Sequence, residues 1–113
     1  MSREISWEYF QSVDIRVGTI IQADDFPKAR KAAYQLRIDF GSEIGILKSS
    51  AQITHHYTKE DLINRQVLAV VNFPKKQIAD FMSECLVTGV EDSDGHIVLT
   101  ALQLKVPNGV KLI

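Results

Sequence analysis

The sequence has little cysteine, no long apolar run and no excess of either charge. Cys85 is the single cysteine among 113 residues, which excludes an intrachain disulfide, and no spaced set of Cys and His is present to hold zinc. The longest apolar run, 67–71, is far too short to span a membrane, and the first residues lack the apolar core of a signal peptide. We therefore expect a soluble, cytoplasmic protein without membrane insertion or a structural metal.

Strong positive charge is also missing. The formal net charge is -1, and the isoelectric point is about 6.3, whereas a domain that binds nucleic acid by bulk charge has a value above about 9. Any phosphate binding must therefore come from a local patch. With 45% hydrophobic residues, a chain of this length can bury one core, so we expect a single domain over 1–113.

Catalytic and cofactor motifs are absent as well. The glycines are isolated, so no Gly-rich loop predicts a nucleotide cofactor, and we expect no cofactor at all. A Cys/His pair can form a thiolate nucleophile, but no orienting motif surrounds Cys85. The adjacent His55 and His56 should point apart in an extended chain, and His96 is distant in sequence. We predict a protein that is not an enzyme, with no catalytic residue.

Apolar residues alternate with period two in most of the chain, which is typical of strands. The clearest case is 34–40, where Tyr34, Leu36, Ile38 and Phe40 should point inward. A first strand is expected over 14–22, with Gly18 at a bend or bulge. The remaining expected strands cover 44–48, 67–73, 84–90, 96–99 and a final turn and strand in 106–113.

Two short helices interrupt this pattern. Ser6 can cap a helix that carries Trp7 and Phe10, and Thr58 can cap a second over 58–63 whose early acids favour the helix dipole. Five short strands with one helix before the fourth predict an all-β, OB-fold five-stranded Greek-key barrel. The N-terminal helix, the inter-strand helix and extra C-terminal strands complete it.

Basic residues fall into two clusters. The first lies on the loop that joins the first two expected strands, a loop that borders the oligonucleotide face in OB folds. It comprises Lys28, Arg30, Lys31 and Arg37. The second comprises Lys75 and Lys76, with Arg16 and Lys48 expected nearby. Each cluster could instead be ordinary solvated charge. If both border one groove, several phosphates could be bound there.

Five stretches in order resemble the CsaA family of export-related chaperones. They are DIRVGTI (14–20), IDFG (38–41), SSAQIT (49–54), VVNFP (70–74) and SECLV (83–87). CsaA belongs to the tRNA-binding domain superfamily, which includes the appended domain of some methionyl-tRNA synthetases and the EMAP-II domain. The resemblance covers nearly the whole chain and implies a homodimer that binds tRNA or other structured RNA and, in CsaA, unfolded preproteins.

By this resemblance, RNA binding is carried to Asn72, Lys75 and Ser83. The neighbours of the second basic cluster match a binding family, so ordinary solvated charge accounts for it less well than for the first. An amide and a hydroxyl can each donate to and accept from base edges or a 2′-hydroxyl, although both side chains often satisfy local backbone groups instead. The acids Asp80 and Glu84 depart from the family pattern, flank this site and should weaken its attraction for phosphate.

Two apolar groups complete the predicted sites. The first surrounds the lysines and could stack bases, receive an apolar peptide or pack the end of the barrel; it comprises Phe73, Ile78, Phe81 and Met82. The second is expected to cover the barrel or a partner subunit, and comprises Trp7, Phe10, Val110, Leu112 and Ile113. The sequence thus favours a non-catalytic, homodimeric RNA-binding protein; the alternatives are a chaperone for unfolded preproteins in protein export and a structural dimerisation module.

Overall fold

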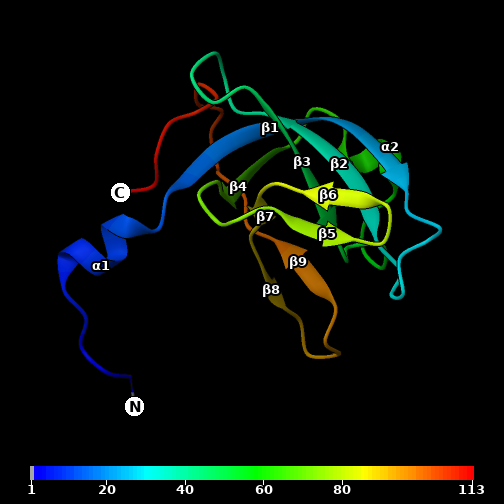
Figure 1. Ribbon diagram of the computed structural model, residues 1–113, viewed down its shortest axis with the longest axis horizontal. Coiled ribbons are helices and arrows are strands. Elements are labelled where there is room, and N and C mark those ends of the chain that lie inside the picture. The colour runs from blue at the N-terminus through cyan, green and yellow to red at the C-terminus, as the bar shows by residue number, and fades with distance from the viewer. Residues whose placement is uncertain (1) are drawn as a thin grey trace.

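The computed structural model describes residues 2–113 and contains a curled, antiparallel five-stranded sheet. Its strand order is β3-β2-β1-β4-β7 (Figure 1). The bounds are β1 Ile15–Asp25, β2 Tyr34–Asp39, β3 Ile46–Ala51, β4 Gln66–Val70 and β7 Leu86–Val87. Two hairpins are attached, β5 Lys76–Ile78 with β6 Phe81–Ser83, and β8 Gly89–Glu91 with β9 Ile97–Leu99. The expected OB-type barrel is confirmed.

The edges of this sheet meet through Glu84, which lies two residues before the start of β7. The Glu84 amide donates to the Lys48 carbonyl at 2.7 Å, and the Lys48 amide donates to the Glu84 carboxylate at 2.9 Å. Two residues after Lys48, the Ser50 amide donates to the Ser83 hydroxyl at 3.2 Å. These backbone and side-chain hydrogen bonds take the place of a regular ladder between the edge strands β3 and β7. They nearly close the sheet into a barrel.

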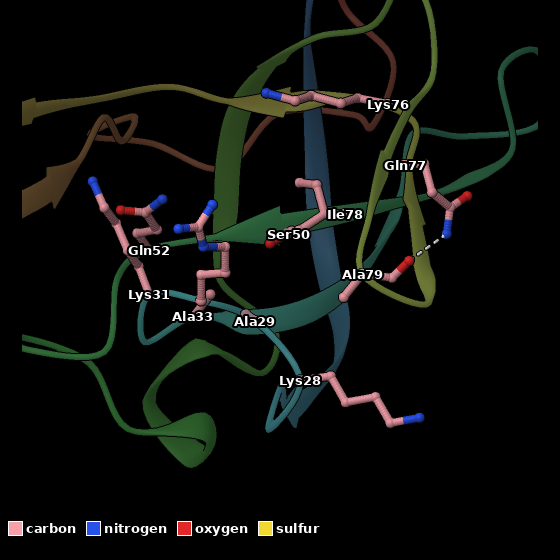
Figure 2. Close-up of a pocket in the computed structure, with 11 residues that line it drawn as sticks. Lys28, Ala29, Lys31, Ala33, Ser50, Gln52, Lys76, Gln77, Ile78 and Ala79 are labelled. Atoms are coloured by element: carbon pink, nitrogen blue, oxygen red, sulfur yellow. Dashed lines mark hydrogen bonds between the residues drawn. The ribbon is translucent and has the colours of Figure 1, made fainter.

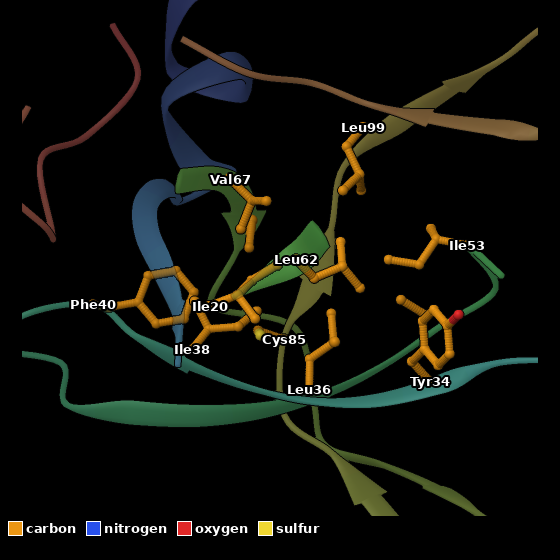
Figure 3. Packing of buried hydrophobic residues seen from close by; sticks show 12 residues of the cluster. Ile20, Tyr34, Leu36, Ile38, Phe40, Ile53, Leu62, Val67, Cys85 and Leu99 are labelled. Atoms are coloured by element: carbon orange, nitrogen blue, oxygen red, sulfur yellow. The ribbon is translucent and has the colours of Figure 1, made fainter. Parts of the chain in front are cut away.

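The core fills the inside of this barrel (Figure 3). All four residues of the expected inward face of β2 and its continuation, Tyr34, Leu36, Ile38 and Phe40, are buried, as predicted. The helix α2 (Lys59–Leu62) follows β3 and precedes β4 in the chain, and its Leu62 is completely buried in this core. A smaller buried cluster of Phe26, Ala33 and Phe81 lies outside this core.

Both predicted helix caps are confirmed. In α1 (Trp7–Ser12), the Ser6 hydroxyl accepts from the Tyr9 amide. In α2, Thr58 and Asp61 form a capping box, in which each side chain accepts from the other residue's amide. Such caps satisfy amides that have no partner within the helix, and each typically stabilises a helix by about 1 kcal/mol.

Several expected strand boundaries were wrong. The bulge in β1 falls between Ile20 and Gln22, not at Gly18, and the strand continues to Asp25. The strand expected over 67–73 ends at Val70. The strand expected over 84–90 is two strands in different sheets, β7 and β8, and Ser83 is the last residue of β6. These breaks follow hydrogen bonds between distant segments, which period-two alternation does not encode.

The expected C-terminal strand is reduced to one bridge, between Arg16 and Lys111. The C-terminal segment 106–113, which we call the tail, nevertheless follows β1 closely. The Gly109 amide donates to the Val17 carbonyl at 2.7 Å, and the Val17 and Leu112 amides bond to Val110 and Ile15 at 3.0 and 2.9 Å. The tail therefore covers the part of the β1 edge that β2 does not reach, since β2 pairs with β1 only from Thr19 onward.

Gly18 has a packing role in this arrangement. A Cβ atom at this position would lie 2.6 Å from the Ile38 side chain and 2.7 Å from the Phe40 ring. Both neighbours are fully buried and have no free space to move into.

We expect Gly18→Ala to lower the free energy of unfolding by about 1–3 kcal/mol, the usual cost of overpacking a core. Chemical denaturation with the slope of the transition compared between variants measures this. An alanine at an unstrained position restricts the unfolded chain and is otherwise stabilising, so an unchanged or higher stability would contradict the close contact.

Candidate nucleic-acid interface

A hollow of about 860 Å³ lies between the β1–β2 loop and the β5–β6 hairpin (Figure 2). We call it the basic groove; it is lined by Lys28, Ala29, Arg30, Lys31, Ala33, Ser50, Gln52, Lys76, Gln77, Ile78 and Ala79. Four of these side chains are cationic. The fold thus brings residues from both basic clusters, which lie more than forty positions apart in the sequence, to one concave surface.

The charges of the groove are unevenly compensated. Lys28 pairs with Asp80 at 3.3 Å and extends away from Lys31 in Figure 2. Within residues 2–113, Arg30, Lys31 and Lys76 have no carboxylate within ion-pair distance. The uncompensated positive charge of the groove therefore comes from these three side chains. A net charge of -1 for the whole chain hides this local patch.

Lys75, directly before β5, pairs with Glu84 at 3.4 Å. Partial burial alone would raise the pKa of Glu84, but the Lys48 amide and the Lys75 ammonium outweigh it, and the pKa lies below its ordinary value. Glu84 is consequently ionised at neutral pH and offsets Lys75. The Lys48 ammonium lies 5.3 Å from the centre of the Phe81 ring, a cation–π distance. Neither lysine lines the basic groove.

Asn72 and Ser83 are both occupied by backbone groups. The Asn72 carbonyl oxygen accepts from the Asp14 amide at 3.0 Å, and its amino group donates to the Ser12 carbonyl at 2.8 Å. The Ser83 hydroxyl accepts from the Ser50 amide and donates to the Cys85 carbonyl at 3.4 Å. The geometry therefore favours the structural alternative: Asn72 attaches α1 to the end of β4, and Ser83 helps close the barrel.

Two predicted cations lie away from the groove. Arg16 pairs with Asp14 at 2.6 Å and donates to the Gly109 carbonyl at 2.9 Å, so it anchors the tail to β1. Arg37 is exposed on β2 and is opposite Lys48 in the register of β3. The structure does not bring either side chain to the lining of the basic groove.

The apolar group around the lysines is divided. Phe81 is buried against Phe26, with ring centres 5.5 Å apart, so the packing alternative holds for it. Met82 and Ile78 are half-buried, and Phe73 is 52% exposed. An apolar cavity of about 300 Å³ lies beside the basic groove and shares Ser50, Lys76 and Ile78 with it. It is completed by Phe73, Pro74, Ser83, Glu84, Cys85 and Leu86.

Cys85 is inert as a nucleophile. Burial raises the pKa of its thiol to about 12, so the reactive thiolate is essentially absent at neutral pH. Among residues 2–113, no three His, Cys, Asp or Glu side chains are grouped so that they could hold a metal ion. In the same part of the chain, no helix has the length and apolarity that a membrane crossing requires.

The expectation that His55 and His56 point apart was wrong. Their ring centres are 4.8 Å apart, and the His96 ring stacks on His55 at 3.5 Å. Sequence reasoning also missed Gln52, which lies in the basic groove. Period two through the stretch 49–54 would have placed Gln52 on the same face as Ser50; nothing in the sequence indicated the histidine stack.

The residues expected at a subunit interface are largely exposed. Trp7 is 60% exposed and Ile113 is 96% exposed, while Phe10 is half-buried with its ring centre 5.5 Å from that of Trp7. Val110 and Leu112 are also exposed. The helix α1 and the tail lie on the same side of the barrel (Figure 1), and the Lys111 ammonium donates to the Gln11 carbonyl at 3.3 Å.

Comparison with known proteins identifies the family. The family model of the tRNA binding domain matches residues 15–111, which is most of the chain. The chain belongs to the tRNA binding domain family. Crystal structures of the chaperone CsaA superimpose closely. The Bacillus anthracis structure has 46% identity, a TM-score of 0.91 and coverage of 98% of this chain and 100% of that chain. The Picrophilus torridus structure has 48% identity, a TM-score of 0.90 and coverage of 97% and 100%. The domain is therefore of the CsaA type.

Curated relatives include methionine--tRNA ligases. The Chlorobium chlorochromatii enzyme is 37% identical over 95 residues, which are 84% of this chain and 13% of the enzyme. The Porphyromonas gingivalis W83 enzyme is 32% identical over 113 residues, which cover 98% of this chain and 16% of the enzyme. The chain thus spans about one-sixth of the length of these relatives, or less, and corresponds to a small part of each.

Proposed function

We propose that the protein binds tRNA or other structured RNA through the basic groove, without catalysing a reaction. The observation that carries this proposal is the convergence of Arg30, Lys31 and Lys76, uncompensated by acids, on one concave surface. Family membership supports it independently.

The mechanism follows from the position of these charges. Cations on the β1–β2 loop and on the β5–β6 hairpin contact phosphates along one RNA backbone, which supplies affinity without reading bases. A concave surface of fixed spacing favours a folded RNA over a random strand, because double-stranded RNA is recognised mainly by shape and backbone. Lys28 and Lys75 contribute less, since Asp80 and Glu84 offset them. Binding to tRNA would place the activity in the cytoplasm.

Charge reversal of the groove tests this mechanism. We expect Lys31→Glu with Lys76→Glu to weaken tRNA binding more than tenfold near 100 mM salt, because two phosphate contacts are replaced by repulsion. The slope of log affinity against log salt should fall by roughly 1.5 to 2. Filter binding or fluorescence anisotropy at several salt concentrations measures both.

The matched control is Lys105→Glu, a charge reversal on the loop after β9, outside the basic groove. Each groove substitution changes the net charge as much as the control does, so Lys31→Glu and Lys76→Glu are also compared with it singly. If the control weakens binding as much as either single variant, general electrostatics explain the binding and the groove is not the site.

We also propose that the protein is a homodimer whose interface includes α1 and the tail. The exposed side chains of Trp7, Val110, Leu112 and Ile113 form apolar surface that a monomer rarely leaves uncovered. Two copies would present two grooves, and RNA long enough to reach both would gain avidity.

Light scattering after size-exclusion chromatography should find about twice the chain mass of 12.7 kDa. We expect Trp7→Ser to shift the protein toward the monomer, because it removes a large apolar contact. Leu104→Ser is the control: this side chain is 79% exposed and lies outside α1 and the tail. A monomeric wild type at micromolar concentration, or equal effects of the two substitutions, would overturn the proposed interface.

A second candidate function is the holding of unfolded polypeptides such as preproteins for export. Two of the similar crystal structures are named as chaperones, and the exposed Phe73 beside the apolar cavity suits an apolar side chain of a peptide. Lys76, Ile78 and Ser50 line both the cavity and the basic groove, so RNA and polypeptide should compete.

We expect Phe73→Ser to reduce the ability of the protein to suppress aggregation of an unfolded polypeptide, with little effect on tRNA affinity. This capture should persist or strengthen as salt rises, because it depends on apolar contact. Lys31 lines the basic groove but not the apolar cavity, so Lys31→Glu should leave the capture of polypeptide intact. Loss of capture with Lys31→Glu but not with Phe73→Ser would contradict the assignment.

A further inference from the structure

A second hollow, of about 670 Å³, adjoins the basic groove. We call it the histidine hollow; it is lined by Lys31, Ala32, Gln52, Thr54, His55, Glu91, Gly95, His96 and Ile97. Lys31 and Gln52 line both hollows and lie together in Figure 2. A strand of RNA leaving the basic groove past Lys31 would therefore enter the histidine hollow directly.

The distinguishing feature of this hollow is a pair of stacked imidazoles. The rings of His55 and His96 are nearly parallel, with an interplanar angle of 6° and a centre-to-centre distance of 3.5 Å. His55 precedes α2 and His96 precedes β9, so the stack joins two segments distant in the sequence. Within the stack, His55 is exposed and His96 is half-buried.

Asp92 fixes this arrangement. Its carboxylate accepts from the His96 amide at 2.9 Å and pairs with the His56 ring at 2.6 Å. The hydrogen bond from His56, followed by that from the His96 amide, lowers the pKa of Asp92 to about 2. The turn between β8 and β9 is thus attached to the segment that carries His55 and His56. The two segments that carry the stacked imidazoles are thus tied together before any ligand arrives, which reduces the ordering cost of stacking on them.

We propose that the histidine hollow is a subsite for one unpaired RNA base, which stacks on the His55–His96 pair while Lys31 contacts the adjoining phosphate. Histidine is among the side chains on which proteins stack splayed-out bases. Gln52 and Thr54 supply hydrogen-bonding groups at the same surface. This inference rests on the proposed RNA binding and specifies its ligand: a paired segment in the basic groove followed by an unpaired nucleotide.

The charges around the stack favour a base over a phosphate. Glu91 lines the hollow and repels phosphate, and the Asp92 carboxylate lies 2.6 Å from the His56 ring. Lys31 is the one cation among the lining residues. A nucleotide oriented with its phosphate at Lys31 and its base over His55 keeps its negative charge beside the cation and puts only the uncharged base near the acids. Stacking needs the π face and not a positive charge, so it does not depend on protonation of the imidazoles.

Two RNA hairpins with equal numbers of phosphates provide the test. One has a blunt stem; the other has a stem two base pairs shorter and a four-nucleotide single-stranded extension that carries 2-aminopurine at its first unpaired position. We expect the wild-type protein to bind the extended hairpin about tenfold more tightly, within the range for one stacked base. The fluorescence of the 2-aminopurine should be quenched on binding.

Substitutions at His55 separate stacking from folding and charge. His55→Ala should abolish the preference and the quenching while leaving affinity for the blunt hairpin unchanged, which also shows that the variant is folded. His55→Phe should keep both, because it retains an aromatic face. Equal binding of the two hairpins by the wild type, or equal loss for both hairpins in His55→Ala, would overturn the subsite. If neither hairpin binds in a salt-sensitive manner, the basic groove is not an RNA site and the parent proposal fails as well.

Discussion

The closure of the barrel at Glu84 is the constraint on which the binding surface depends. Its amide and carboxylate both bond to the backbone of Lys48, which joins β3 to the segment entering β7. The β5–β6 hairpin directly precedes this junction and is therefore held over the sheet, where Lys76 faces the β1–β2 loop across the basic groove. The carboxylate remains charged because its bonds outweigh the effect of burial. One acid thus closes the fold and also offsets Lys75, while Lys76 in the groove stays uncompensated.

This arrangement explains how a slightly acidic chain can present a cationic surface. Acids are placed next to particular bases: Asp14 beside Arg16, Asp80 beside Lys28, and Glu84 beside Lys75. Each pair is largely exposed or half-buried and adds little stability by itself. In the basic groove they leave Arg30, Lys31 and Lys76 uncompensated, so this surface keeps a local positive charge although the whole chain is slightly acidic.

The sequence predicted the parts of the molecule that local physics determines. Alternation gave the inward face of 34–40, and cap-forming side chains gave both helices, because these signals act within a few residues. The two basic clusters were recognised, but their convergence depends on barrel closure. The division of 84–90 between two sheets and the stacking of His96 on His55 depend on contacts between distant segments. Asn72 illustrates the same limit: its amide has chemistry suited to RNA, yet the fold assigns both ends to backbone groups of Ser12 and Asp14.

The position of the tail along β1 has a consequence for the order of folding. Residues 109–112 bond to Ile15 and Val17, so β1 acquires part of its edge from a segment that the ribosome makes about ninety residues later. Until then, the open amides and carbonyls of that edge are a template on which another nascent chain could pair. The tail acts as an intramolecular seal against such pairing, and a truncated product would lack it.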